Sequence, residues 1–99
     1  MNESIIKEYI KNGKFRISDH AVKRMIQRNI SLNDIKQAVL KGEIIEEYSG
    51  DKYSPSCLIY GQTDLEKDLH VLLSFPPNIV IVTIYEPDPL EWIECKIRR

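Results

Sequence analysis

The sequence predicts an α+β fold in which N-terminal helices pack on one face of a four-stranded antiparallel meander sheet. Hydrophobic residues recur at helical spacing up to residue 42, whereas from residue 43 they alternate with a period of two and many are β-branched. The segments between the expected strands are short enough for hairpins, which make neighbouring strands antiparallel. Because 99 residues suffice for one domain only, we expect a single domain over residues 1–99 with one thin core.

Each of the three expected helices has a start signal and a stop signal. The first follows Asn2 and ends where Gly13 supplies a left-handed residue. Ser18 caps the second helix, and Ser31 opens the third with a capping box that has Asp34 in the acidic place. The sequence therefore predicts a short first helix that ends at residues 12–13, a second over about residues 19–28, and a third that opens at residues 31–34 and closes at residues 41–42.

Four strands are expected to follow these helices. The sequence places them at residues 44–49, 56–62, 69–75 and 79–86, with connections at 50–52, 63–68 and 76–78. The last strand is apolar on both faces for most of its length, as expected for a strand that helices cover. The tail after Pro87, which contains Trp92, fits either a short strand or a helical turn.

The net charge of −1 conceals a division between the two halves of the chain. Residues 1–42 contain nine Lys and Arg against four Asp and Glu, whereas residues 43–99 contain five against eleven. If the first half forms the helical layer, one side of the molecule carries most of the positive potential, which attracts a polyanion such as a nucleic acid. The alternative is an ordinary solvated surface of mixed charge.

The second expected helix carries an unusual polar face formed by His20, Arg24 and Arg28 at spacings of four residues. The opposite side of that helix carries the apolar residues Ala21, Val22, Met25 and Ile26, which are expected to face the core. The His/Arg face then points to solvent or to a cleft. Like charges one turn apart repel, so the two guanidinium groups favour an anion beside them. That anion is either a ligand phosphate or a carboxylate from the acidic half of the chain.

A second group of candidates lies on the expected strands. His70 shares one face of the third strand with Leu72 and Ser74, and Thr83 shares one face of the fourth with Tyr85. The hydroxyl groups can donate hydrogen bonds to a phosphate, and an imidazole can act as general base or acid near neutral pH. Each residue also has a structural interpretation: Tyr85 as an amphipathic edge residue, Thr83 as a strand former, and His70 as a hydrogen-bonded sheet histidine.

The sequence contains no pattern typical of a metal site, a disulfide, a nucleotide-binding loop or a membrane span. Cys57 and Cys95 lack the Cys/His spacing of a metal site, so we expect reduced, buried thiols, no metal and no disulfide. Glycine-rich phosphate loops are absent, and we expect no cofactor. The apolar runs at 71–73 and 79–82 are too short to cross a bilayer and the N-terminus lacks a signal-peptide core, so we expect a soluble cytoplasmic protein without membrane contact.

Residues 15–31 contain the pattern H-A-x-x-R-M-x-x-R-x-I, starting at His20. With the later segments 42–48, 51–56, 69–71 and 82–87 and with Trp92, this pattern resembles a bacterial family of about this length that is catalogued as a domain of unknown function. The resemblance covers about residues 15–92. Members of this family resemble the RelE and BrnT class of toxin–antitoxin ribonucleases, and many are thought to lie beside a small antitoxin, often one with a YgiT-type zinc finger.

The resemblance implies a RelE-like fold and the toxin of a type II toxin–antitoxin pair. Such a toxin is a metal-independent endoribonuclease, an mRNA interferase in which an RNA 2′-OH attacks the neighbouring phosphate. Carried over to this chain, His20 is the general base or acid, Arg24 and Arg28 clamp the phosphate, and Thr83 and Tyr85 are auxiliary donors. Lys23 and His70 are further candidates for phosphate binding.

The implied partners are an antitoxin, either of the YgiT type or DNA-binding, and RNA, free or on the ribosome. The sequence pI of about 6.1 departs from the basic character of that class. The alternative hypothesis is a non-catalytic interaction module, or an inactive descendant of a toxin. In the interaction module, Arg24 and Arg28 pair with acidic groups of a partner protein or of the chain's own strands.

Overall fold

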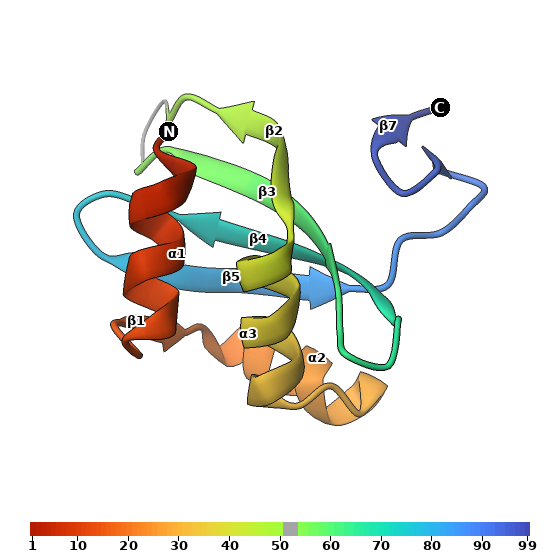
Figure 1. Cartoon of the computed structure of the whole chain (residues 1–99), viewed down its shortest axis with the longest axis horizontal. Coiled ribbons are helices and arrows are strands. Elements are labelled where there is room, and N and C mark those ends of the chain that lie inside the picture. The colour runs from red at the N-terminus through yellow and green to blue at the C-terminus, as the bar shows by residue number, and fades with distance from the viewer. Residues whose placement is uncertain (51–53) are drawn as a thin grey trace.

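The computed structural model describes residues 1–50 and 54–99, which form an α+β fold of three helices, a five-stranded mixed sheet and a C-terminal two-stranded hairpin (Figure 1). The helices are α1 (Glu3–Lys11), α2 (Asp19–Arg28) and α3 (Leu32–Lys41). The sheet contains β1 (Phe15–Ile17), β2 (Glu43–Tyr48), β3 (Ser56–Gln62), β4 (Asp68–Ser74) and β5 (Ile79–Tyr85), and the hairpin contains β6 (Trp92–Ile93) and β7 (Ile97–Arg98).

Ser18 and Ser31 cap α2 and α3, as the sequence predicts, and Asn2 caps α1. Asn2 accepts a hydrogen bond from the backbone N–H of Ile5 at 3.1 Å. Ser31 and Asp34 form a reciprocal capping box, with donor–acceptor distances of 2.9 and 3.0 Å. After α1, Gly13 has a φ of 72°, the left-handed conformation that glycine adopts without strain. Local polar signals therefore determine where the helices start.

The prediction of a four-stranded antiparallel meander is wrong. The strands β2 to β5 pair in antiparallel succession, but β1 adds a fifth strand that pairs with β5 in parallel, from Phe15 opposite Ile79 to Ile17 opposite Ile81. The strand β1 has only three residues, too few to show a period of two, and its partner lies more than sixty residues away in the sequence. The connection expected at 50–52 lies mostly outside the described residues.

The helices α1 and α3 cover one face of the sheet, as Figure 1 shows, and α2 packs along β5 at the end of the sheet that carries β1. The core between these layers is formed by buried aliphatic residues, including Ile6, Ile10, Ile35, Val39, Ile59, Val71, Leu73 and Ile81. A Cβ placed on Gly61 would lie 1.8 Å from the backbone oxygen of Ala38. Glycine at this position is thus what allows α3 to lie directly on β3.

The sequence of the tail after Pro87 fits either a short strand or a helical turn. In the structure this tail forms the β6–β7 hairpin (residues 92–98). Its Trp92 is 2% exposed. Both cysteines are free, with Cys57 buried and Cys95 half-buried. None of the helices among the described residues has the length and apolar character that a membrane span requires.

Candidate functional site

The N-terminus of α2 is fixed to the strand β5 by Ser18. Its backbone N–H donates to the carbonyl of Ile81 at 3.0 Å, and its hydroxyl donates to the carbonyl of Val82 at 2.9 Å. The same hydroxyl oxygen accepts the N–H of Ala21 at 3.0 Å, which makes Ser18 the N-cap of α2. One serine thereby sets both the start of α2 and its position beside the sheet, and with them the direction of the His/Arg face.

The His/Arg face of α2 lies on the surface. His20, Lys23 and Arg28 are exposed and Arg24 is half-buried. Within residues 1–50 and 54–99, none of these four side chains forms a hydrogen bond or an ion pair. The prediction that this face points to solvent therefore fits the structure, whereas no described carboxylate lies against it.

Five Lys and Arg side chains elsewhere in the described chain are paired with carboxylates, and a sixth, Arg99, donates to the carbonyl of Pro89. Lys7 lies 3.1 Å from Glu3, Lys96 lies 2.7 Å from Glu43, and Lys41, Lys67 and Arg98 are paired with Asp64, Glu86 and Glu46. Residues 11–36, by contrast, hold seven Lys and Arg against two Asp. In the part of the chain that the structure describes, none of these seven cations is in an ion pair. Uncompensated positive charge is thus concentrated on and beside α2.

One prediction about α2 is wrong: Val22 and Ile26 do not face the core. They are 41% and 77% exposed, and Ala21 is the one fully buried residue of the helix. The reason is the position of α2 beside β5, where contact through Ala21 and the half-buried Met25 leaves both flanks of the helix uncovered. As a result α2 presents a basic flank and, on the other side of Lys23, an apolar flank.

Two of the strand candidates, His70 and Tyr85, are brought together. They are paired across β4 and β5, and Nδ1 of His70 lies 3.1 Å from the hydroxyl of Tyr85. Thr83 is opposite Leu72 on the same sheet face, which is the face turned away from α1 and α3. The candidates therefore form two groups, one on α2 and one on β4 and β5, with no hydrogen bond or ion pair between them among the described residues.

The tautomer of His70 follows from its partners. Nε2 lies 2.6 Å from the carbonyl oxygen of Cys95, which can only accept, so Nε2 carries the proton. In the neutral ring Nδ1 then accepts from the hydroxyl of Tyr85. Burial lowers the pKa of His70 below its usual value, although the hydrogen bond to Cys95 and the carboxylate of Glu46 act in the opposite direction. His70 is thus a neutral, fully satisfied histidine with no exposed surface.

Four residues around His70 were missed by the sequence reasoning: Glu46, Tyr60, Trp92 and Arg98. The rings of Trp92 and Tyr60 meet the imidazole edge-on, with centroids 4.5 and 6.0 Å away. Arg98 pairs with Glu46 at 2.9 Å and lies 4.6 Å above the ring of Trp92. Alternation along β3 would have placed Tyr60 opposite His70, but nothing local in the sequence indicates that Trp92 and Arg98 return to this face.

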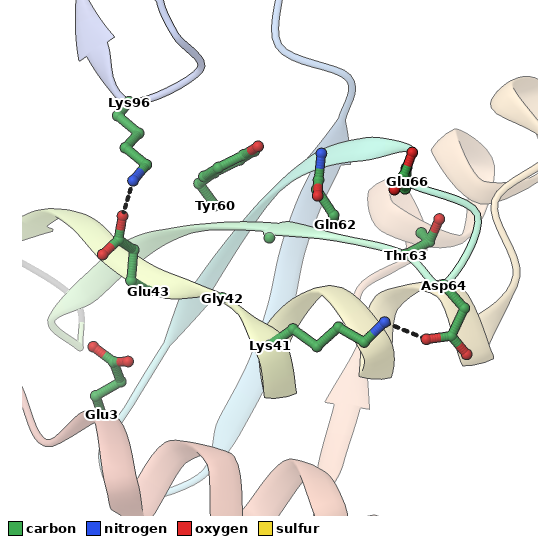
Figure 2. A pocket seen from close by; sticks show the side chains of 11 residues that line it. Glu3, Lys41, Gly42, Glu43, Tyr60, Gln62, Thr63, Asp64, Glu66 and Lys96 are labelled. Atoms are coloured by element: carbon green, nitrogen blue, oxygen red, sulfur yellow. Dashed lines mark hydrogen bonds and ion pairs between the residues drawn. The ribbon is translucent and has the colours of Figure 1, made fainter.

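An open groove of about 700 Å³ lies where α3 ends and β2 begins (Figure 2). Figure 2 shows its two ion pairs: Lys96 of the C-terminal hairpin reaches Glu43, and Lys41 of α3 reaches Asp64 in the β3–β4 turn. Both lysines are neutralised by these partners. Glu3 on the rim is paired with Lys7, which leaves Glu66 as the one carboxylate of the groove without a cation partner among the described residues. The groove therefore has a negative balance, which disfavours a polyanion.

Among the described residues, no three His, Cys, Asp or Glu side chains are arranged to hold a metal ion. A family model described as a domain of unknown function (DUF4258) matches residues 17–86. The match confirms the expected resemblance to a family of that kind, and it says nothing of RelE or of toxins. No curated protein and no solved structure gives a match.

Proposed function

The chain belongs to the DUF4258 family, and from that premise we propose that it is a metal-independent endoribonuclease that binds RNA phosphates through α2. One observation carries the proposal: the cations on and beside α2 have no carboxylate partner in the described chain, whereas five cations elsewhere do. Guanidinium groups without a protein partner offer phosphate oxygens a charge-assisted and often bidentate contact. A negative overall charge does not oppose local binding, because eleven of the fifteen acidic residues lie in the other half of the chain.

The proposed chemistry uses one histidine and two arginines of a single helix. His20 takes the proton of an RNA 2′-OH, whose oxygen attacks the adjacent phosphorus. The bond from phosphorus to the 5′-oxygen breaks, a 2′,3′-cyclic phosphate remains, and the departing oxygen is protonated by water. Arg24, which is half-buried and so less free to move, would stabilise the charge that develops on the phosphate, together with Arg28.

The wider assignment is part of the same proposal. We place the protein as the toxin of a type II toxin–antitoxin pair in the cytoplasm, with a RelE-like arrangement, held inactive by an antitoxin. In the present conformation His70 is buried and the hydroxyl of Tyr85 is engaged by it, so the pair does not share the surface with His20. Tyr85 is thus assigned to a second location with His70, and Thr83 lies on the same sheet face as this pair.

Induction in a bacterial host tests this function. Wild-type protein should arrest growth and create new RNA 5′ ends, and His20→Ala should do neither while remaining folded. Gln27→Ala is the matched control, because Gln27 is an exposed residue of the same helix and has no role in the proposed chemistry. Cleavage by His20→Ala at the wild-type rate would remove His20 from the site.

The apolar flank of α2 supports a second candidate function, docking of a partner protein. Ile26 is 77% exposed on a helix whose other flank is basic, which suits an acidic segment with its own apolar side chains. If docking is the function, Ile26→Asp should abolish binding of the protein encoded in the adjacent reading frame and leave the RNA 5′ ends unchanged. Undiminished binding by that variant would rule out this flank as the interface.

A further inference from the structure

His70 is buried on a sheet face that α1 and α3 do not cover. Along β4 the residues Leu69, Val71 and Leu73 point into the core under the helices, so His70 points to the opposite face. On that face, residues of the neighbouring strands and of the C-terminal hairpin surround its imidazole. Tyr60 and Tyr85 belong to the neighbouring strands, whereas Trp92 and the carbonyl of Cys95 belong to the C-terminal hairpin. Burial of the imidazole therefore depends on the hairpin.

The hairpin is fixed to this face by a small number of contacts. Cys95 accepts the Nε2–H of His70, Arg98 pairs with Glu46, and Lys96 pairs with Glu43 at 2.7 Å. The side chains of Arg98 and Lys96 remain 60% and 50% exposed, which weakens their ion pairs through solvent screening. Trp92 supplies the main apolar contact. The hairpin is thus held by one buried aromatic side chain, one hydrogen bond to the buried imidazole and two ion pairs that solvent screens.

The hairpin itself has little internal stability. Each of its strands has two residues, and isolated two-stranded hairpins are marginal in water. Its turn places Glu94 and Cys95 at φ values of 50° and 65°, which side chains other than glycine or asparagine rarely adopt. Its side chains Ile93 and Ile97 are 41% and 63% exposed, so they contribute little apolar burial. Opening of such an element does not require the core to unfold.

We propose that His70 and Tyr85 form a second site, which the hairpin closes in cis. In the open state a neutral imidazole and a phenol hydroxyl would face solvent 3.1 Å apart, on a face that also carries Tyr60 and Thr83. Such a pair suits proton transfer to and from a substrate hydroxyl, and aromatic side chains beside it offer a stacking surface for a base. The substrate class is therefore single-stranded RNA. This choice of substrate rests on the proposed function. The closure of the site by the hairpin rests on the contacts of the hairpin with His70 alone.

Modification of histidine by diethyl pyrocarbonate tests the closed state, because the chain has only two histidines. In the wild-type protein the exposed His20 should react at once and the buried His70 slowly. Arg98→Ala removes both the ion pair to Glu46 and the contact over Trp92, and we expect modification of His70 to become about tenfold faster. Lys41→Ala, which breaks an exposed ion pair that includes no residue of the hairpin, is the matched control and should leave the rate unchanged.

Equal modification rates of His70 in the wild-type and Arg98→Ala proteins would overturn the proposal. Hydrogen exchange on the wild-type protein gives a second measurement that needs no variant. The amides of Lys96 and Arg99, which bond within the hairpin, should exchange about a hundredfold faster than those of β4. Exchange of both sets at one common rate would also overturn it.

RNA cleavage separates this proposal from the proposed function. Faster cleavage by Arg98→Ala, lost again on adding Tyr85→Phe, supports RNA as the substrate of the second site. If His70 becomes reactive and cleavage does not change, the hairpin closes the face but RNA is not its substrate, and the assignment of substrate class fails while the closed state stands.

Discussion

Removing the charge of Arg24 and Arg28 should weaken RNA binding and make it less sensitive to salt. The double variant Arg24→Gln/Arg28→Gln keeps two good helix formers on α2 and breaks no hydrogen bond or ion pair of the described chain. Its effect on binding is therefore not confused with loss of an internal contact. Salt sensitivity is the informative quantity, because it counts the phosphates that the protein neutralises.

The magnitude follows from the three cations of α2, which are Lys23, Arg24 and Arg28. Each phosphate contact on a single strand adds about 0.7 to the slope of log affinity against log salt, so three contacts give about 2.1 and one contact gives about 0.7. Between about 50 and 200 mM salt, the wild-type protein should lose about 20-fold in affinity and the double variant only about threefold.

Fluorescence anisotropy with a labelled 2′-O-methyl RNA oligonucleotide measures this slope without cleavage, because the attacking hydroxyl is blocked. The control is Lys41→Gln/Lys67→Gln, which removes the same formal charge from two cations that already have carboxylate partners. The reasoning is refuted if both double variants reduce the slope equally, or if the α2 variant leaves it at the wild-type value.

Other consequences concern stability and reactivity. Gly61→Ala should lower the free energy of unfolding by about 3 kcal/mol in denaturant titrations, because its methyl group would lie 1.8 Å from the backbone oxygen of Ala38; a loss below about 0.5 kcal/mol would contradict the close packing of α3. Burial lowers the pKa of His70, so the unfolded chain binds a proton that the folded one excludes, and melting temperatures should fall as the pH drops below about 6.5, a trend that His70→Gln should reduce. Burial raises the pKa of Cys57 to about 12, so a thiol reagent at mildly alkaline pH should leave it unmodified until the protein unfolds. Ser31→Ala should cost about 1 kcal/mol of stability, measured by thermal unfolding, because the capping box of α3 is lost.

Local chemistry made the helices and most of the sheet predictable. Ser18 and Ser31 start helices because their side chains satisfy backbone N–H groups within three residues, and that information is contained in the neighbouring sequence. The strand β1 was missed because three residues carry no period and its partner β5 lies far along the chain. Parallel pairing of this kind is specified by packing across the whole domain and leaves no local signal.

In the candidate site too, local relations were predictable from the sequence and long-range contacts were not. The spacing of His20, Arg24 and Arg28 placed them on one face correctly, since helical geometry alone determines that relation. The exposure of Ile26 was not predictable, because it depends on where α2 lies beside the sheet. The contact of Trp92 with His70 depends on a hairpin whose turn residues, Glu94 and Cys95, lack the Asn-Gly signal that marks such turns.

The most direct measurement of the central claim is an amide chemical-shift titration of the protein with the 2′-O-methyl RNA oligonucleotide. RNA binding by α2 predicts that the largest shifts map to Asp19–Arg28 and decrease with added salt, with little change at Glu43 and Asp64 in the acidic groove. Shifts that center on the groove, or no shifts at RNA concentrations that saturate the wild-type anisotropy signal, would contradict it.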